Sequence, residues 1–172
     1  NTVARTKVET YMVPVLEDPE GEFRNDSTFM IDLLEDRFQD RRAEPEDEAD
    51  AFLAYLIEDF ADECLLFPFF MMRFRHEEDR KFNSQWILYE HLRGDTTSPQ
   101  FDALATMWAG RQTKLVRATC GEQEMFPLHD ECLDALLKIT ERAFTSGMFL
   151  FGTRPSRAEF AIYGILSQLI LD

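Results

Sequence analysis

Residues 149–172 read FLFGTRPSRAEFAIYGILSQLILD, a stretch that begins a helix and predicts that this helix is buried. Ser156 is a preferred N-cap residue, and Glu159, three residues on, can return a hydrogen bond to the Ser156 backbone, which makes a capping box. From residue 158 onward the pattern is apolar nearly all round, so we expect the helix to run through the middle of a helical bundle. Gly164 is costly inside a helix, and we expect a neighbouring helix too close there for a side chain.

The composition limits the class of protein. The 172 residues are 45% hydrophobic and 13% aromatic, enough to bury a substantial core. The formal net charge of −15 argues against nucleic acid or an anionic membrane surface as a partner, because like charges repel. The longest apolar run, residues 65–72, is too short to span a bilayer, and three widely spaced cysteines indicate reduced thiols. We therefore expect a cytoplasmic protein that does not enter a membrane.

The first 40 residues have a strand, turn, strand and helix pattern. Residues 11–16 are a β-type run, and a turn-rich segment separates them from a second short run at 22–24, which predicts a hairpin. The apolar residues of 29–38 are spaced as in a helix. Residues 41–50 are charged and contain a proline, so we expect a linker there.

The chain from residue 51 to residue 172 has helical spacing throughout. One apolar stripe runs along residues 53–74 and predicts a long helix, which Pro68 should kink. We expect three further helices before the last one, over residues 77–92, 98–118 and 124–144.

The order of three short motifs resembles the glutathione S-transferase superfamily in a bacterial-type form. These motifs are Val13-Pro14, then Asp26-Ser27-Thr28, and finally Gly152-Thr-Arg-Pro-Ser156-Arg-Ala-Glu159-Phe. The resemblance spans almost the whole chain. It implies a mainly α fold, in which a partial thioredoxin-like α/β domain over residues 1–40 precedes an all-α domain over residues 51–172.

The resemblance also implies what lies outside this sequence. The chain begins without Met and ends inside a helical pattern, so we expect it to be a piece of a longer protein. The start of the thioredoxin-like domain, the residue that activates the glutathione thiol and the last helices are then missing, and no catalytic residue can be named. The family usually has Asp where this chain has Glu159, but Glu is the standard capping-box acceptor, so we expect the cap to be kept.

Four residues match the glutathione-binding motifs of the family. A cis Pro14 would turn the backbone of Val13 toward an extended tripeptide. Ser27 opens a helix, so its hydroxyl and the nearby N–H groups would hold the γ-glutamyl carboxylate, and Asp26 would meet the ammonium group. The local sequence alone favours an ordinary edge-strand proline and an ordinary N-cap, and it is the order of the family motifs that favours a binding site.

The apolar segment 67–72 is expected in the core of the bundle. In the family this helix also walls the pocket for the electrophile, which makes Phe67, Phe70 and Met71 candidates for that pocket. No metal site is predicted, because Cys120, His129 and Cys132 lack a fourth ligand and a standard spacing.

The acidic residues of the long helix point to a partner. We expect that they do not pack in the core, and the family usually dimerises at this helix, so a homodimer interface is predicted here. Basic side chains of the other subunit would meet the acidic face. The acidic residues are Glu58, Asp59, Asp62 and Glu63, and the candidate basic residues are Arg37, Arg41 and Arg42.

The predicted function is conjugation of glutathione, as co-substrate, to a small apolar electrophile. Two alternatives stay open: a non-catalytic binding or scaffold protein with this fold, and a glutathione-dependent reductase or dehalogenase. The residue that faces the glutathione sulfur distinguishes them, since Tyr or Ser favours conjugation, Cys favours mixed-disulfide chemistry, and the absence of any such group favours a scaffold.

Overall fold

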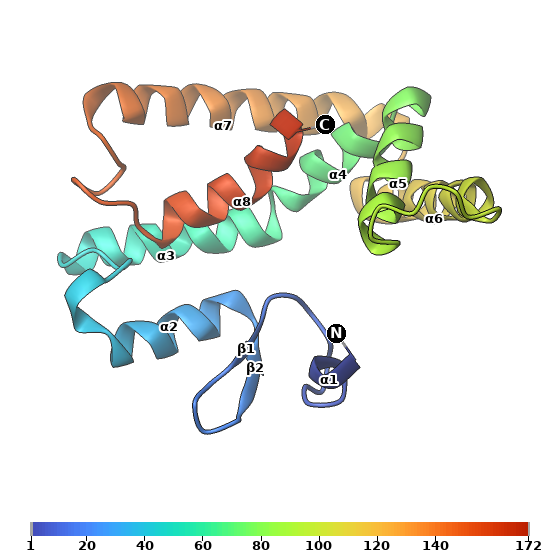
Figure 1. The fold of residues 1–172 in the computed structure, drawn as a ribbon. Helices are drawn as coiled ribbons and strands as arrows, with labels where there is room; N and C mark the ends of the chain where they lie inside the picture. The colour runs from blue at the N-terminus through green and yellow to red at the C-terminus, as the bar shows by residue number, and fades with distance from the viewer. Residues whose placement is uncertain (1, 172) are drawn as a thin grey trace.

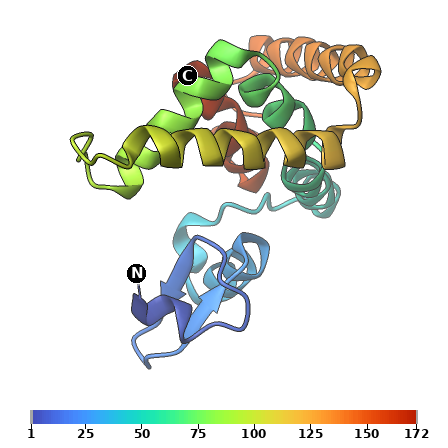
Figure 2. The ribbon, with the colours of Figure 1, turned by 90° about the vertical axis from the view of Figure 1, so that its right-hand side faces the viewer.

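The computed structural model describes residues 2–171 and is mainly helical, as predicted. A short helix α1 (Thr2–Arg5), a hairpin of β1 (Val15–Glu17) and β2 (Phe23–Asn25), and helix α2 (Ser27–Arg37) form the N-terminal segment. A single-turn helix η1 (Gln39–Arg41) and a linker join this segment to the helices that follow (Figure 2). Within the described residues, no helix combines the length and the hydrophobicity that crossing a bilayer requires.

The predicted hairpin is confirmed, with a shorter first strand than the sequence suggested and a second strand displaced by one residue. Its strands are antiparallel, with Val15 opposite Asn25 and Glu17 opposite Phe23. The side chain of Asp18 holds the turn, because its Oδ1 accepts hydrogen bonds from the backbone N–H groups of Glu20 and Glu22 at 3.1 and 2.9 Å. Polar side chains that bond to the nearby backbone are a standard means of fixing such turns.

The predicted long helix is broken into α3 (Glu48–Glu63) and α4 (Leu66–Phe74). Asp47 caps α3, since its Oδ1 accepts from the N–H groups of Ala49 and Asp50. The chain breaks at residues 64–65 instead of bending at Pro68, which lies in the first turn of α4. A proline has no N–H and its ring conflicts with the carbonyl four residues earlier, here that of Cys64, so the first helix ends before that carbonyl is needed.

The remaining helices agree with the predicted ranges to within a few residues. In Figure 1, α8 lies between α3 and α7, while α5 and α6 lie together at one end of the bundle. A residue with positive φ, Arg93 (55°), and Gly94 (85°) follow the end of α5. The elements are α5 (Glu77–His91), α6 (Phe101–Cys120), the single turn η2 (Gln123–Met125), α7 (Phe126–Ser146) and α8 (Arg157–Leu171).

Two apolar clusters form the core of the helical region. One, which we call the apolar end, joins α4 to α6 through Met71, Phe74, Val116 and Cys120. The other joins α3 to α8 through Ala61, Leu65 and Ile162.

The three candidates for the electrophile pocket belong to the apolar end. Met71 is completely buried, and Phe67 and Phe70 pack against the same cluster. None of the cavities described below is lined by these residues. Met71 has no exposed surface to offer a ligand, whereas Phe67 and Phe70 are partly buried, so the electrophile pocket stays a prediction.

Helix α8 does not run through the middle of the bundle, contrary to the prediction. Phe160 and Tyr163 expose 55% and 72% of their surface. No atom lies within 4 Å of the position that a Cβ of Gly164 would take, so close approach of a neighbouring helix does not explain this glycine. Among the described side chains of α8, Arg157, Ala158 and Ile162 are buried.

The predicted capping interaction before α8 is present, with one difference. Oε2 of Glu159 accepts from the backbone N–H of Ser156 at 2.8 Å, and Oε1 accepts from the N–H of Leu150 at 2.6 Å. The hydroxyl of Ser156 donates to the same carboxylate instead of accepting from the backbone. Because the longer Glu side chain also reaches Leu150, it fixes the loop before α8 as well as its first turn.

Candidate functional site

The first turn of α2 is the part of the predicted glutathione site that the structure defines best. Asp26, not Ser27, is the N-cap: it has a φ of 76°, and its side chain accepts from the N–H of Phe29 at 3.5 Å. Ser27 is the first residue of the 11-residue helix and is exposed. Within the described part of the chain its hydroxyl has no hydrogen-bond partner, so it can bind a ligand.

A narrow crevice lies beside this turn, between α2, α3 and α8. Its volume is about 210 Å³, and its wall is mostly apolar. It brings together residues that are far apart in the sequence, namely Ser27, Ile31, Glu58, Asp62, Arg157, Phe160, Ala161, Gly164 and Ile165.

A buried ion pair fixes the walls of this crevice. The side chains of Arg157 and Glu58 are each only 2% exposed, and Nε of Arg157 donates to Oε2 of Glu58. Nη1 of Arg157 donates to Asp32 on α2 at 3.0 Å, and the hydroxyl of Thr28 donates to Oε1 of Glu58 at 3.0 Å. These bonds connect the first turns of α2 to α3 and α8. We call the four residues Arg157, Glu58, Asp32 and Thr28 the charged junction.

The ion pair raises the pKa of Arg157. Burial acts against its charge, but the hydrogen bond and the attraction of Glu58, with a smaller contribution from Asp32, raise the pKa of Arg157 above its usual value. The guanidinium also lies over the ring of Tyr55, 5.2 Å from its centroid. Arg157 therefore stays charged in the protein interior.

The prediction that Glu58 faces a second subunit is wrong, because this carboxylate neutralises a buried arginine of the same chain. The sequence did contain a signal for the pair. An arginine in the first turn of a helix expected to be buried needs a carboxylate partner, since an unpaired buried charge costs several kcal/mol. Two of the arginines proposed as partners from a second subunit also have partners in their own chain: Arg42 bonds to Glu35 and Glu44, and Arg37 lies 3.7 Å from Glu20.

One buried hydrogen-bond donor of the charged junction has no acceptor among the described residues. Nη2 of Arg157 is buried, and no described residue accepts a hydrogen bond from it. A buried donor without a partner is unfavourable. Arg157 is also among the residues that line the crevice.

Asp62 gives the crevice a third titratable group, beside Glu58 and Arg157. Burial raises its pKa above the ordinary value, and the repulsion of nearby carboxylates adds to this shift, first among them Glu58. An aspartate in this state keeps its proton to higher pH than an exposed one.

Val13 and Pro14 lie apart from this crevice, on the chain that leads into β1. Their peptide bond is cis, and Val13 is 74% exposed. Neither residue, nor Asp26, is among those that line the crevice with Ser27. Of the four predicted binding residues, the structure thus brings only Ser27 to a cavity.

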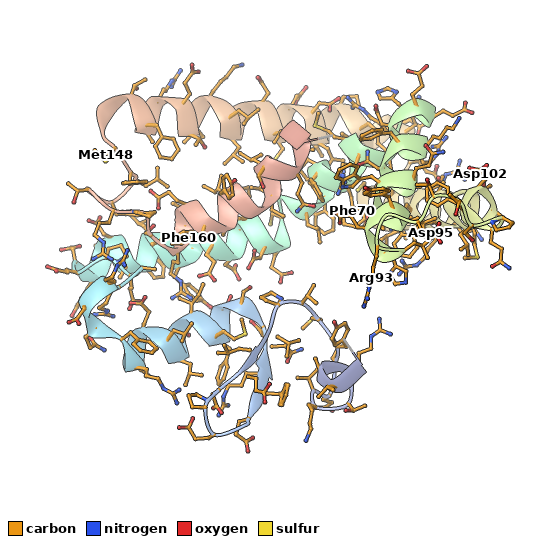
Figure 3. The ribbon with its side chains drawn as sticks, viewed as in Figure 1. Phe70, Arg93, Asp95, Asp102, Met148 and Phe160 are labelled. Atoms are coloured by element: carbon orange, nitrogen blue, oxygen red, sulfur yellow. The ribbon has the colours of Figure 1, made fainter. Side chains whose placement is uncertain are left out.

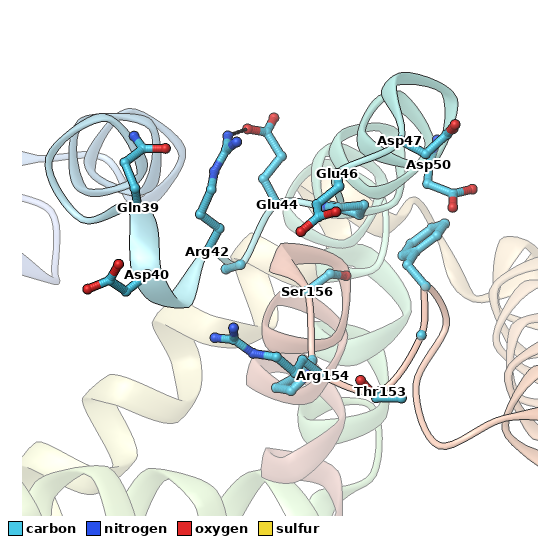
Figure 4. Close-up of a pocket in the computed structure, with 15 residues that line it drawn as sticks. Gln39, Asp40, Arg42, Glu44, Glu46, Asp47, Asp50, Thr153, Arg154 and Ser156 are labelled. Carbon is cyan, nitrogen blue, oxygen red and sulfur yellow. Dashed lines mark hydrogen bonds and ion pairs between the residues drawn. The ribbon is translucent and has the colours of Figure 1, made fainter.

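A larger cavity of about 460 Å³ lies between the linker and the loop before α8 (Figure 4). Its acidic residues include Asp47, which caps α3, and Glu44, which forms an ion pair with Arg42 at 2.6 Å. The backbone N–H of Arg157 donates to the carbonyl of Ala43 beside it. These interactions stabilise the linker, so we interpret this hollow as a structural junction.

Two of the three possible metal ligands in the sequence, Cys120 and His129, have structural roles. Cys120 is buried with its Sγ 3.2 Å from the carbonyl oxygen of Phe67, and Nε2 of His129 lies 2.9 Å from the carbonyl oxygen of Cys120. Cys132 is exposed. The pair Cys120 and His129 links α4, α6 and α7.

The chain matches no protein-family model, no curated protein and no solved structure. The resemblance to glutathione S-transferases therefore stays a prediction from the sequence motifs. The geometry by itself defines a class of site: a helix N-terminus with an exposed hydroxyl, next to a crevice with a buried guanidinium donor and apolar walls. Such an arrangement can bind the carboxylate of a small, partly apolar ligand.

Proposed function

We propose that this chain is a glutathione S-transferase-like protein that binds glutathione at the N-terminus of α2 and conjugates it to a small apolar electrophile. The observation that carries the proposal is the exposed and unpartnered hydroxyl of Ser27, at the first position of a helix that borders a crevice. The sequence motifs around Pro14 and Ser156 support the family.

The γ-glutamyl carboxylate would bind at the first turn of α2. The Ser27 hydroxyl and the backbone N–H groups of Ser27 and Thr28 donate to it, and the positive end of the helix dipole favours its charge. The carboxylate of Asp26 would accept from the ammonium group of the same γ-glutamyl residue, and the backbone of Val13 would pair with the rest of the tripeptide.

The chemistry of conjugation needs a thiolate. Directed hydrogen bonds lower the pKa of the glutathione thiol, the sulfur forms a bond to the electrophilic carbon, and the leaving group departs with its electron pair. The apolar side chains of Ile31, Phe160 and Ile165 line the crevice and suit an apolar electrophile.

One observation favours the non-catalytic alternative, a glutathione-binding protein or scaffold. The residues expected to wall the electrophile pocket, Phe67, Phe70 and Met71, are packed in the core. If the crevice does not replace that pocket, the protein would bind glutathione without conjugating it. The residue that faces the sulfur decides between these functions and a reductase or dehalogenase.

We further propose a homodimer along α3. With Glu58 in the interior, the available face of this helix carries exposed Phe52 and Leu56, followed by the exposed carboxylates of Asp59 and Glu63. Sedimentation at micromolar concentration and low salt tests this, and a monomer would contradict it.

Titration calorimetry of the intact protein with glutathione tests the binding site. We expect the Ser27→Ala variant to bind about ten- to a hundredfold more weakly, because a charge-assisted hydrogen bond to a carboxylate is lost. Ser98→Ala is the matched control, since Ser98 also lies just before a helix, α6, and should leave the affinity unchanged. Equal affinities of wild type and Ser27→Ala would show that Ser27 does not bind the ligand.

A further inference from the structure

Helix α5 carries three aromatic side chains in a stack on its surface. The ring centroids of Phe82 and Trp86 are 6.4 Å apart, and those of Trp86 and Tyr89 are 5.9 Å apart, with interplanar angles of 17° and 26°. Each side chain exposes between 44% and 48% of its surface. We call these three residues the aromatic stack.

The aromatic stack lies on the side of α5 that is turned away from the bundle. Its residues are spaced by four and three positions and so share one face of the helix. Of the buried residues of α5, Ser84 and Leu88 fall on the opposite side of the helix, and Asn83 lies beside the stack. Three large apolar groups in a row on a solvent-exposed face are typical of an interaction surface.

Two unpaired charges of opposite sign bracket the stack. Glu78 lies four positions before Phe82 on α5, and Arg93 lies just past the end of this helix, with a positive φ of 55°. Both are exposed, and neither has an ion-pair partner among the described residues. Figure 3 shows the side chain of Arg93 extending away from the end of α5.

We propose that this surface binds α5 of a second copy of the chain, with the two helices antiparallel. A two-fold axis near residues 85 and 86 makes the surface complementary to itself, because the acidic end of each helix meets the basic end of the other. The axis sets two pairs of α5 positions opposite each other, Phe82 and Tyr89, and Gln85 and Trp86. It also brings Glu78 of each copy toward Arg93 of the other, just past the end of that copy's α5.

The surroundings of the stack fit this partner. A hollow of about 270 Å³ lined by Met72, Phe82 and Leu169 adjoins the stack at its Phe82 end. In the antiparallel arrangement Tyr89 of the second copy falls beside this hollow. A contact made by one pair of helices is small, so we expect micromolar association.

This interface is independent of the glutathione proposal and of the dimer along α3, because it uses a different helix. The test is sedimentation equilibrium of wild type and charge-reversal variants up to about 200 μM, a concentration chosen for a micromolar dimer. Glu78→Arg alone and Arg93→Glu alone should each weaken the association by about tenfold or more, since each replaces two attractive pairs with two repulsive ones. Lys114→Glu, at an exposed position of α6 and not on α5, is the charge-matched control and should have no effect.

Sedimentation of a mixture of the two single variants provides the decisive experiment. A heterodimer of Glu78→Arg with Arg93→Glu restores opposite charges at both ends, so the mixture should associate like wild type while each variant alone does not. An α3 interface is indifferent to these charges and cannot produce this rescue. Single variants that associate like wild type, a mixture that shows no recovery, or a wild-type chain that makes no α5-dependent contact would each overturn the proposal.

Discussion

The apolar end and the charged junction are stabilised in opposite ways. At the apolar end, Met71, Phe74, Val116 and Cys120 contact one another without any charge in the cluster. At the charged junction, Arg157 and Glu58 are as deeply buried as Met71, but their stability depends on pairing. Substitutions at the apolar end should lower the free energy of unfolding in proportion to the side-chain volume removed. At the charged junction, the loss should be large whenever one partner of the ion pair is removed and the other stays.

The largest effect is expected from Glu58→Ala at the charged junction. The substitution leaves the buried guanidinium of Arg157 with only the half-exposed Asp32, and breaking a buried pair in this way costs about 3–5 kcal/mol. Urea unfolding measures the loss. Asp59→Ala, at the next, exposed position of α3, is the control and should change the stability by less than about 0.5 kcal/mol.

The same pair allows a sharper version of the experiment. If both charges are replaced by apolar groups, as in Glu58→Leu with Arg157→Met, most of the lost stability should return, because no buried charge is left unpaired. A double variant as unstable as the sum of its parts would mean that the pair is not the reason for the loss.

Met71→Ala is the corresponding test of the apolar end. Removing a fully buried methionine side chain from a packed core costs about 2–5 kcal/mol, and the loss should not depend on salt or pH. Met107, which is 64% exposed, gives the matched control, and its substitution by Ala should cost less than about 0.5 kcal/mol. Equal unfolding midpoints for the two variants would contradict the assignment of Met71 to the core.

The start of α8 should show an intermediate effect. Glu159→Ala leaves the N–H groups of Leu150 and Ser156 without their acceptor and should cost about 2 kcal/mol. Ser156→Ala removes one hydroxyl and should cost about 1 kcal/mol. Chemical denaturation that ranked the two variants in the reverse order would show that the carboxylate does not hold the loop.

The smallest effect is expected from Asp62→Asn, and it depends on pH. The folded state raises the pKa of Asp62, so its contribution to stability is complete below the ordinary pKa of aspartate and is lost as the pH rises through the folded value. The variant should therefore be more stable than wild type at pH 7.5, with a difference that shrinks toward pH 4. Urea titrations at the two pH values measure this, and a difference independent of pH would contradict it.

Sequence patterns predicted the helices well because their apolar residues recur every three or four positions, as along α5 and α7. They did not predict which side chains from distant parts of the sequence pair with each other. The periodic pattern of α3 predicts that Glu58 is exposed to solvent. The pattern cannot show otherwise, because the partner that buries Glu58, Arg157, is 99 positions away in the sequence. The nearly uniform apolar pattern of α8 likewise hid the exposed face around Gly164, because periodicity does not tell which apolar face remains uncovered.

The candidate site was predictable only in part, for the same reason. Ser27 was identified from its match to a family motif at the start of a helix, although Asp26 proved to be the cap itself. The walls that α3 and α8 add to the crevice depend on tertiary contacts. The short helix α1 was not predicted, because four residues carry too little periodicity to be recognised.

The central claim is that glutathione binds at the first turn of α2 beside the crevice. Amide chemical-shift mapping during a glutathione titration tests it most directly, because it locates even a millimolar site residue by residue. We expect concentration-dependent shifts at Ser27 and Thr28, with further shifts at Gly164 and Ile165 across the crevice, and no shift of the Trp86 indole on α5. Shifts confined to other parts of the chain, or none at saturating glutathione, would contradict the account.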